Sequence, residues 1–361
     1  MEKQDNITKL AAHKGPQQRF LQSDADIAIY GGSAGGGKTH ALLLEPLYHI
    51  DNPKFRGVIF RRTHTQIMQS GGIWDKATEL YSLVGATANL SSMTWKYPKG
   101  SIMSFNHLQH EKDKLNYQGA ELVFIGFDEL PHFTETQFWY MLSRNRSTCG
   151  IKPYIRATTN PDEESWVAKL IAWWIDQDTG FAIKERSGVK RWFVRDEDAL
   201  VWGDSEEELK EKISYAQPRS LTFIPAKLED NPSLSGTDYR SSLLSLPQIE
   251  RERLLNGNWK IRPASGMYFK PAWFPIIDRI PYLSIIHVCR YWDRAATRAE
   301  NGRDPDYTVG VLMGQTEQHT YIVLDVVRLQ GSPLDVETII KATSRIDREN
   351  WNDIYEIGIE Q

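Results

Sequence analysis

Short apolar runs alternate with amphipathic segments over roughly the first 160 residues of the chain. The run at residues 122–127 has no polar interruption, which is typical of a strand buried on both faces of a parallel sheet. Strands are predicted at residues 27–30, 58–62, 122–127 and 154–158, and helices at residues 39–50, 74–83 and 134–144. This alternation predicts an α/β domain with a parallel sheet. Residues 93–107, with Pro98-Lys99-Gly100 at the turn, predict an inserted hairpin.

The pattern changes after residue 161. Helices are predicted at residues 165–175, 206–216 and 239–255, and a hairpin at residues 181–194 that turns at Ser187-Gly188. We interpret residues 1–262 as one domain whose last part, about 162–262, forms a smaller helical and hairpin subdomain. The proline-rich residues 263–282 are predicted to be a linker.

The sequence predicts a second domain at residues 283–361. Strands are expected at residues 285–292, 308–313, 321–329 and 355–359, with a helix at about 334–350. Asp293 follows the first strand and Glu360 the fourth. This order is typical of the first part of a ribonuclease H-like nuclease, in which paired carboxylates hold two Mg²⁺ or Mn²⁺ ions. Acids at strand ends are also common in proteins without such a site, so both interpretations remain open.

Composition restricts these interpretations only a little. A chain of 361 residues favours two domains, and 40% hydrophobic with 25% charged residues describes an ordinary globular protein. The net charge of -4 gives no overall nucleic-acid signature. Cys149 and Cys289 lack metal-ligand spacing, and no apolar stretch approaches membrane-spanning length. We therefore expect a protein of the cytoplasm with no membrane partner.

A phosphate-binding loop follows the first predicted strand. The pattern G-x-x-x-x-G-K-[ST] is matched by Gly32, Ser33, Ala34, Gly35, Gly36, Gly37, Lys38 and Thr39. In this motif the loop N–H groups face phosphate oxygens, the lysine reaches the β- and γ-phosphates and the threonine hydroxyl binds Mg²⁺. A glycine-rich turn can match the pattern by chance, but the strand before it and the helix after it favour a nucleotide site.

Asp128 and Glu129 end the apolar run at residues 122–127. Such a pair can simply cap the next helix. Downstream of a phosphate-binding loop, it is interpreted as a Walker B element, in which Asp128 holds the Mg²⁺ shell and Glu129 orients the attacking water. The sequence therefore predicts that the chain binds and hydrolyses ATP with Mg²⁺.

An ATPase of this kind, followed by such a second domain, resembles the large terminase subunit of tailed bacteriophages. The resemblance extends over nearly the whole chain and is carried by residues 15–21, 31–39, 58–63, 117–119, 127–130, 157–161, 223–226, 230–232, 251–259, 292–293 and 306–308. It implies a DNA-packaging motor in which Gln17 contacts adenine and Asn160, in the coupling motif, senses the γ-phosphate. It also implies a metal-dependent endonuclease that cuts concatemeric viral DNA, with Asp293 and Glu360 as metal ligands.

The implied partners are double-stranded viral DNA, the small terminase subunit, the portal protein and other copies of the chain in a ring on the procapsid, in the host cytoplasm. Two features differ from the family pattern. The third metal-binding acid of the family lies beyond residue 361, so we expect weak Mn²⁺ or Mg²⁺ binding and little cleavage. Some family members carry an arginine finger shortly before the Walker B element, but here that stretch, residues 116–119, has no arginine. Arg144 and Arg146 on the following helix are therefore candidates to act on a neighbouring subunit, or are surface residues.

Two rival functions are also compatible with the nucleotide motifs. A helicase- or repair-type ATPase shares the nucleotide motifs, but it needs a second motor lobe that the sequence does not reveal. A non-catalytic nucleotide-binding scaffold has no need of a water-orienting acid such as Glu129.

Overall fold

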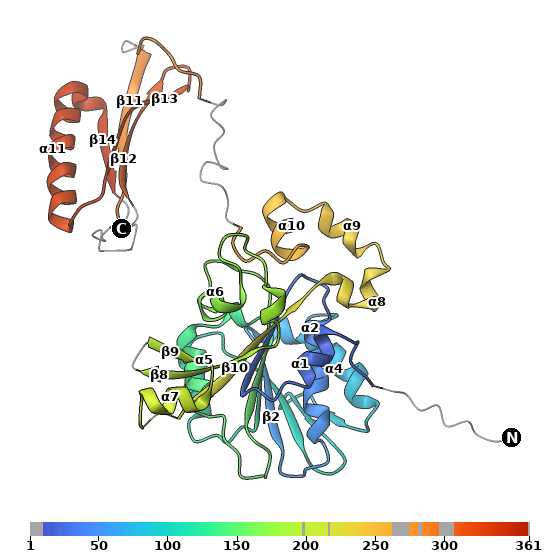
Figure 1. Ribbon diagram of the computed structural model, residues 1–361. Coiled ribbons are helices and arrows are strands. Elements are labelled where there is room, and N and C mark those ends of the chain that lie inside the picture. The colour runs from blue at the N-terminus through green and yellow to red at the C-terminus, as the bar shows by residue number, and fades with distance from the viewer. Residues whose placement is uncertain are drawn as a thin grey trace. The chain divides into compact units, whose positions relative to one another are not determined.

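A computed structural model describes residues 10–196, 199–215, 217–261, 274–280, 284–295 and 307–359. The chain divides into two compact units, residues 1–265 and residues 266–361. Each unit has its own sheet (Figure 1).

Unit 1 is built around a ten-stranded sheet in the order β3-β4-β5-β2-β6-β7-β1-β10-β8-β9. The strands are β1 (Ile27–Gly32), β2 (Arg56–Arg61), β3 (Thr87–Asn89), β4 (Thr94–Lys96), β5 (Ile102–His107), β6 (Phe124–Phe127), β7 (Tyr154–Thr159), β8 (Lys190–Asp196), β9 (Ala199–Gly203) and β10 (Arg219–Ala226). The strands from β5 to β10 in this order pair in parallel, and the strands at both edges pair antiparallel. The predicted α/β fold with a parallel sheet is confirmed.

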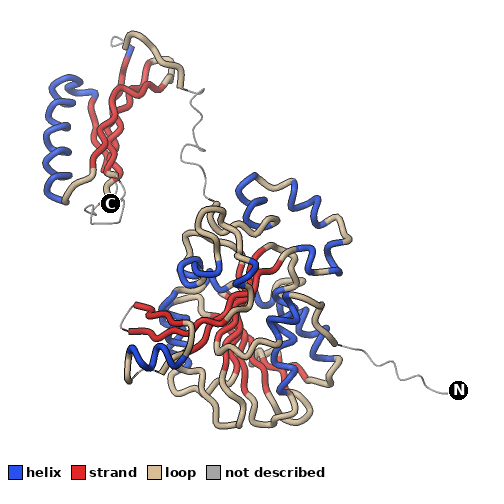
Figure 2. Tube along the Cα trace, in the orientation of Figure 1, coloured by secondary structure: helices blue, strands red, loops and turns tan. Residues whose placement is uncertain are grey.

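Helices cover both faces of this sheet, as the blue segments beside the red strands in Figure 2 show. The α-helices of the unit are α1 (Pro16–Leu21), α2 (Lys38–Leu44), α3 (His64–Met68), α4 (Ile73–Ser82), α5 (Glu135–Leu142), α6 (Trp166–Leu170), α7 (Glu206–Lys212), α8 (Pro232–Ser235), α9 (Tyr239–Leu244) and α10 (Gln248–Leu254). Alternate residues of β1 point to opposite faces, so Tyr30 packs with the core beside α2 and α4, and Ile29 with the core beside α5 and α6. Two apolar layers therefore hold the sheet between helices.

Several predicted elements have different limits in the structure. The helix expected at 39–50 is α2 followed by a 3-10 turn, η1 (Glu45–His49), because Pro46 lacks the N–H that a continuing helix needs. Pro247 likewise divides the helix expected at 239–255 into α9 and α10. The helix expected at 165–175 ends at Leu170. The inserted hairpin is confirmed as β4 and β5.

The hairpin predicted at residues 181–194 is wrong. Residues Lys184–Arg186 form a 3-10 turn, and the hairpin is made by β8 and β9. The N–H of Gly188 donates to the carbonyl of Phe223 in β10, so the predicted turn is tied to a distant strand. β10 itself was not predicted. Three strands of the segment expected as a smaller subdomain thus continue the main sheet.

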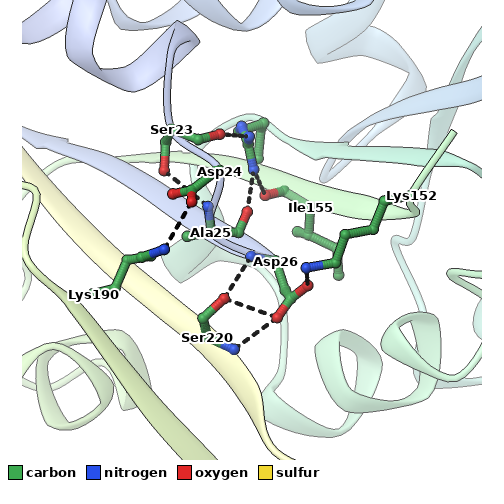
Figure 3. Close-up of polar contacts among 9 residues, drawn as sticks. Ser23, Asp24, Ala25, Asp26, Lys152, Ile155, Lys190 and Ser220 are labelled. Carbon is green, nitrogen blue, oxygen red and sulfur yellow. Dashed lines mark hydrogen bonds and ion pairs between the residues drawn. The ribbon is translucent and has the colours of Figure 1, made fainter. Parts of the chain in front are cut away.

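A polar network fastens β10 to the chain just before β1 (Figure 3). The Asp26 N–H donates to Ser220 Oγ at 3.0 Å, and the Ser220 N–H donates to Asp26 Oδ2 at 2.8 Å. Lys152 Nζ pairs with Asp26 Oδ1 at 2.6 Å, and Lys190 Nζ with Asp24 Oδ2 at 2.8 Å. Burial alone would raise the pKa of Asp26, but the Lys152 and Ser220 donors hold it below its ordinary value. This network sets the register of the strand that carries the phosphate-binding loop.

Unit 2 has a four-stranded sheet in the order β13-β12-β11-β14. Its elements are β11 (Ile285–Asp293), β12 (Thr308–Thr316), β13 (Tyr321–Leu329), α11 (Pro333–Trp351), η9 (Asn352–Ile354) and β14 (Tyr355–Ile359). β12 is antiparallel to both of its neighbours, and β14 is parallel to β11. Val336 and Ile340 of α11 pack against Trp292, so the helix covers one face of the sheet. Most of the linker predicted at 263–282 lies outside the described residues.

Candidate nucleotide site

The carboxyl ends of the central strands of unit 1 lie at one edge of the sheet and carry the predicted site residues. Phe127 pairs with Phe60 on one side and with Ala157 on the other. The residues that follow these three positions therefore lie at the same edge of the sheet. They include Arg61, Asp128 and the segment from Thr158 to Asn160, beside the loop that leaves β1. Such an edge is where ligands bind in open α/β sheets.

Glycine is required at two positions of the phosphate-binding loop. At Gly32 the backbone φ is 130°, and an added Cβ would lie 2.3 Å from the carbonyl oxygen of Ala226. At Gly37 φ is 73°, and an added Cβ would lie 2.9 Å from Gln17 Nε2. The loop therefore turns where only glycine fits without strain.

The last part of unit 1 holds the loop from outside. The N–H of Ser33 donates to the Ala226 carbonyl at 2.8 Å, and the N–H of Ala34 to the Leu254 carbonyl at 2.6 Å. Asn231 Nδ2 donates to the carbonyl of Gly35 at 2.7 Å. Residues between 226 and 254 thus fix the outer half of the loop, a contribution that the sequence analysis did not predict.

Lys38 turns back onto the loop that precedes it. Its Nζ donates to the carbonyl oxygen of Ser33 at 2.6 Å and to that of Gly32 at 3.2 Å. Burial lowers the pKa of Lys38 to about 8, although the nearby Glu129 and Asp128 act in the opposite direction. The hydrogen-bond acceptors of this buried ammonium group are neutral carbonyl oxygens, which a negatively charged oxygen can replace.

Asp128 is fully buried, and its carboxylate contacts three side chains. Thr39 Oγ1 lies 3.1 Å from Asp128 Oδ1, Thr158 Oγ1 donates to the same oxygen at 2.6 Å, and Arg61 Nη2 lies 2.7 Å from Oδ2. Thr39 and Asp128 are therefore adjacent, although they are 89 positions apart in the chain.

Glu129 has a backbone that non-glycine residues rarely adopt. Its φ is 62°, and its N–H donates to Thr158 Oγ1 at 3.0 Å. Asn160 Nδ2 lies 2.9 and 2.8 Å from the two carboxylate oxygens of Glu129. Burial and the neighbouring Asp128 raise the pKa of Glu129, whereas Lys38 and Arg61 act to lower it. Backbone strain combined with a raised carboxyl pKa is characteristic of functional positions.

A cavity of 810 Å³ opens beside these residues. Its walls include the loop from Ala34 to Thr39 together with Gln17, Arg61, Glu129, Asn160 and Asn231. Gly32, Ser33 and Asp128 do not line it. Because Thr39 and Arg61 both line the cavity and both contact Asp128, the aspartate lies behind them.

The amide of Gln17 is bound to the main chain at both ends. The His13 N–H donates to its Oε1 at 2.6 Å, and its Nε2 donates to the Gly37 carbonyl at 3.1 Å. Gln17 thus joins α1 to the phosphate-binding loop at the cavity wall. A contact between Gln17 and adenine stays a prediction.

Residues 29–276, well over half of the chain, match the family model described as the terminase large subunit, T4likevirus-type, N-terminal. The chain belongs to the terminase large subunit family. No curated protein matches this terminase chain.

Solved structures of large terminases are similar to this chain at low identity. The large terminase of a thermophilic bacteriophage is 14% identical, with a TM-score of 0.47, over 97% of this chain and 78% of that one. The HK97 bacteriophage large terminase is 12% identical, with a TM-score of 0.43, over 98% of this chain and 71% of that one. The large terminase ATPase domain of Thermus phage P74-26 is 13% identical, with a TM-score of 0.43, over 70% of this chain and 94% of that one.

Action of Arg144 or Arg146 of this terminase on a neighbouring subunit stays a prediction. Arg144 Nε donates to Ser143 Oγ, and its guanidinium lies 5.2 Å from the centre of the Tyr140 ring. Arg146 donates to the carbonyls of Gly119 and Ala120. Neither lines the cavity, whereas Arg61 does. The place of Arg61 at this site is not predictable from the sequence, because an arginine at a strand end has no local signature.

The second candidate site, in unit 2, is only partly described. Asp293 ends β11. The register pairs Trp292, which directly precedes Asp293, with Ile359, which directly precedes Glu360. Glu360 lies outside the described residues. Over the described ranges no group of three or more His, Cys, Asp or Glu side chains is arranged to hold a metal ion. Within the same ranges, no helix has the length and apolar character needed to cross a membrane.

Proposed function

We propose that unit 1 hydrolyses ATP to drive the packaging of viral DNA. The observation that carries this proposal is the meeting of Lys38, Thr39, Glu129 and Asn160 on the wall of one cavity, with Asp128 joined to Thr39 behind it. These residues come from three separate strand ends and match the parts that ATP hydrolysis requires.

Binding is assigned to the loop, Lys38, Thr39 and Asp128. Lys38 exchanges its carbonyl partners for phosphate oxygens, which are stronger acceptors for an ammonium group. The hydroxyl of Thr39 and the carboxylate of Asp128 fit Mg²⁺, because they offer two adjacent oxygen ligands of the kind this ion prefers. Bound Mg²⁺ supplies charge neutralisation at the phosphates.

Catalysis is assigned to Glu129. Its carboxylate accepts a proton from water as the water oxygen attacks the γ-phosphorus, and its raised pKa makes it a better base. Asn160 holds both carboxylate oxygens of Glu129 in this structure. When Asn160 turns to a γ-phosphate, Glu129 is released, so nucleotide binding and water activation are linked through one amide.

Two substitutions separate these roles. Lys38→Ala is expected to abolish both nucleotide binding and turnover. Glu129→Gln keeps the shape of the side chain, so it is expected to bind ATP and to lose at least about a hundredfold in turnover. ATPase rates with and without double-stranded DNA, measured beside nucleotide titrations, check both. Near-normal turnover in Glu129→Gln would remove the proposed base.

Family membership supports the partners of this motor. We propose that the chain acts in the host cytoplasm on double-stranded viral DNA, with the small terminase subunit, the portal protein and further copies in a ring on the procapsid. DNA-stimulated ATPase activity, and its further rise on addition of portal-bearing procapsids, are the expected results. An ATPase rate that neither DNA nor portal-bearing procapsids change would favour the nucleotide-binding scaffold instead.

For unit 2 we propose the first part of a ribonuclease H-like, metal-dependent endonuclease domain that cuts concatemeric DNA. The proposal is supported by the strand order β13-β12-β11-β14, with α11 before the parallel strand, and by Asp293 at the end of β11. Asp293 and Glu360 are the proposed Mg²⁺ or Mn²⁺ ligands. Asp293→Ala is expected to lose Mn²⁺ binding and any metal-dependent cleavage while ATP turnover stays unchanged, and Asp353→Ala serves as the control. Equal Mn²⁺ affinity in both variants would argue against this site.

A further inference from the structure

Arg61 is the last residue of β2 and lies at the Asp128 end of the cavity. Its side chain is 18% exposed, and its Nη2 is 2.7 Å from Asp128 Oδ2. Its Nε is buried and has no hydrogen-bond partner among the described residues. A guanidinium group carries five N–H donors in one plane, so this contact leaves part of a desolvated cation unsatisfied. The cavity wall therefore contains a guanidinium group that is paired with Asp128 but has a buried N–H, on Nε, without an acceptor among the described residues.

The other basic side chains do not share this arrangement. Arg62, one residue later, donates to the Leu108 carbonyl at 2.7 Å and to Gln137 Oε1 at 3.0 Å, and it does not line the cavity. Lys76 lines the cavity as well, but within the described residues it forms no hydrogen bond or ion pair with Asp128, Thr39 or Glu129. Arg61 instead lines the cavity beside Glu129, the proposed base.

We propose that Arg61 is an arginine acting within its own subunit that binds the γ-phosphate of ATP. This assignment rests on the proposed ATPase function. Without nucleotide, Arg61 neutralises the buried carboxylate of Asp128. With ATP and Mg²⁺ present, Asp128 belongs to the metal shell, and the guanidinium turns to the γ-phosphate oxygens, for which its planar donors are suited.

Hydrolysis takes place with Arg61 beside the γ-phosphate. The water oxygen forms a bond to the γ-phosphorus, the bond from that phosphorus to the β–γ bridging oxygen breaks, and the water proton goes to Glu129. Both electrons of the broken bond stay on the ADP oxygen. Arg61 compensates the negative charge on the transferred phosphoryl group throughout, so it is required for the triphosphate and not for the diphosphate.

The test compares Arg61→Ala with Arg62→Ala in the full chain. Affinities for ATP-γ-S and for ADP, each with Mg²⁺, are measured by titration calorimetry. In Arg61→Ala the ATP-γ-S affinity is expected to fall by about ten- to a hundredfold, because a charged hydrogen bond to the γ-phosphate is lost, while ADP affinity stays within about threefold. Arg62→Ala is expected to change neither affinity. ADP binding also shows that the loop is folded. If Arg61→Ala does not fold, Arg61→Lys retains the charge beside Asp128 and is expected to lose part of the preference for ATP-γ-S.

Two different failures can be told apart. If the wild-type chain bound neither nucleotide, the proposed function would be wrong and Arg61 would have no phosphate to bind. If the wild-type chain bound both nucleotides and hydrolysed ATP, but Arg61→Ala or Arg61→Lys kept the wild-type ratio of ATP-γ-S to ADP affinity, only the assignment of Arg61 would be overturned.

Discussion

The replacement Glu45→Gln probes a buried ion pair on the side of unit 1 away from the cavity. Glu45 directly follows α2, is 3% exposed, and accepts a hydrogen bond from Arg156 Nε at 3.1 Å. Its second oxygen is buried without a hydrogen-bond partner among the described residues. Burial raises the pKa of Glu45 from 4.5 to about 7, although Arg156 acts in the opposite direction. Desolvation therefore outweighs the single contact with arginine.

The size of the effect follows from linkage. A pKa difference of about 2.5 between the folded and unfolded states corresponds to about 3 kcal/mol of unfolding free energy, at about 1.4 kcal/mol per pKa unit. Because the pKa is raised in the folded state, this stability is fully present below pH 4.5 and is lost as the pH rises to about 7. Glutamine does not ionise, so the variant lacks this decline.

Arg156 keeps other partners in the variant, which favours a folded protein. It donates to the carbonyls of Ser23 at 2.6 Å, Ala25 at 3.1 Å and Ile155 at 3.0 Å, three residues that are labelled in Figure 3. The stabilities of wild type and Glu45→Gln are measured by urea unfolding from pH 4.5 to 8. The difference between the two curves cancels all other titrating groups and is expected to change by about 3 kcal/mol over this range. The exposed Glu185→Gln is the control. Parallel curves for wild type and Glu45→Gln would refute the reasoning.

Three further predictions concern the cavity. Thr158→Val removes the hydroxyl that donates to Asp128 and accepts from the Glu129 N–H, so urea unfolding is expected to show a loss of about 1–3 kcal/mol that Thr158→Ser restores. Gly32→Ala places a Cβ 2.3 Å from the Ala226 carbonyl oxygen and is expected to abolish ADP binding in a titration. Gly71→Ala, at φ 71° with nothing within 4 Å of the added Cβ, imposes backbone strain alone and should bind ADP normally. Asn160→Ala is expected to keep ADP affinity but to lose the coupling of turnover to DNA movement, and unchanged coupling in a translocation assay would contradict its role.

The sequence alone determined the elements whose signals are local. The loop at residues 32–39 was recognisable because a fixed spacing of glycine, lysine and threonine follows a short apolar strand. The strand before Asp128 was recognisable because a strand buried on both faces has no polar residues. Residues within a few positions of each other produced both signals, so no knowledge of the fold was needed to predict a nucleotide site.

Only the tertiary structure decided which distant residues join that site. β10 was missed because its run includes Arg219 and Pro225, and its place is set by pairing with β1, almost two hundred residues earlier. Arg61 meets Asp128, and Arg156 meets Glu45, through the order of strands in the sheet and the burial of their charges. Pairing between distant strands depends on the packing of the whole sheet, and burial determines which charges need partners, so neither can be read from a local pattern.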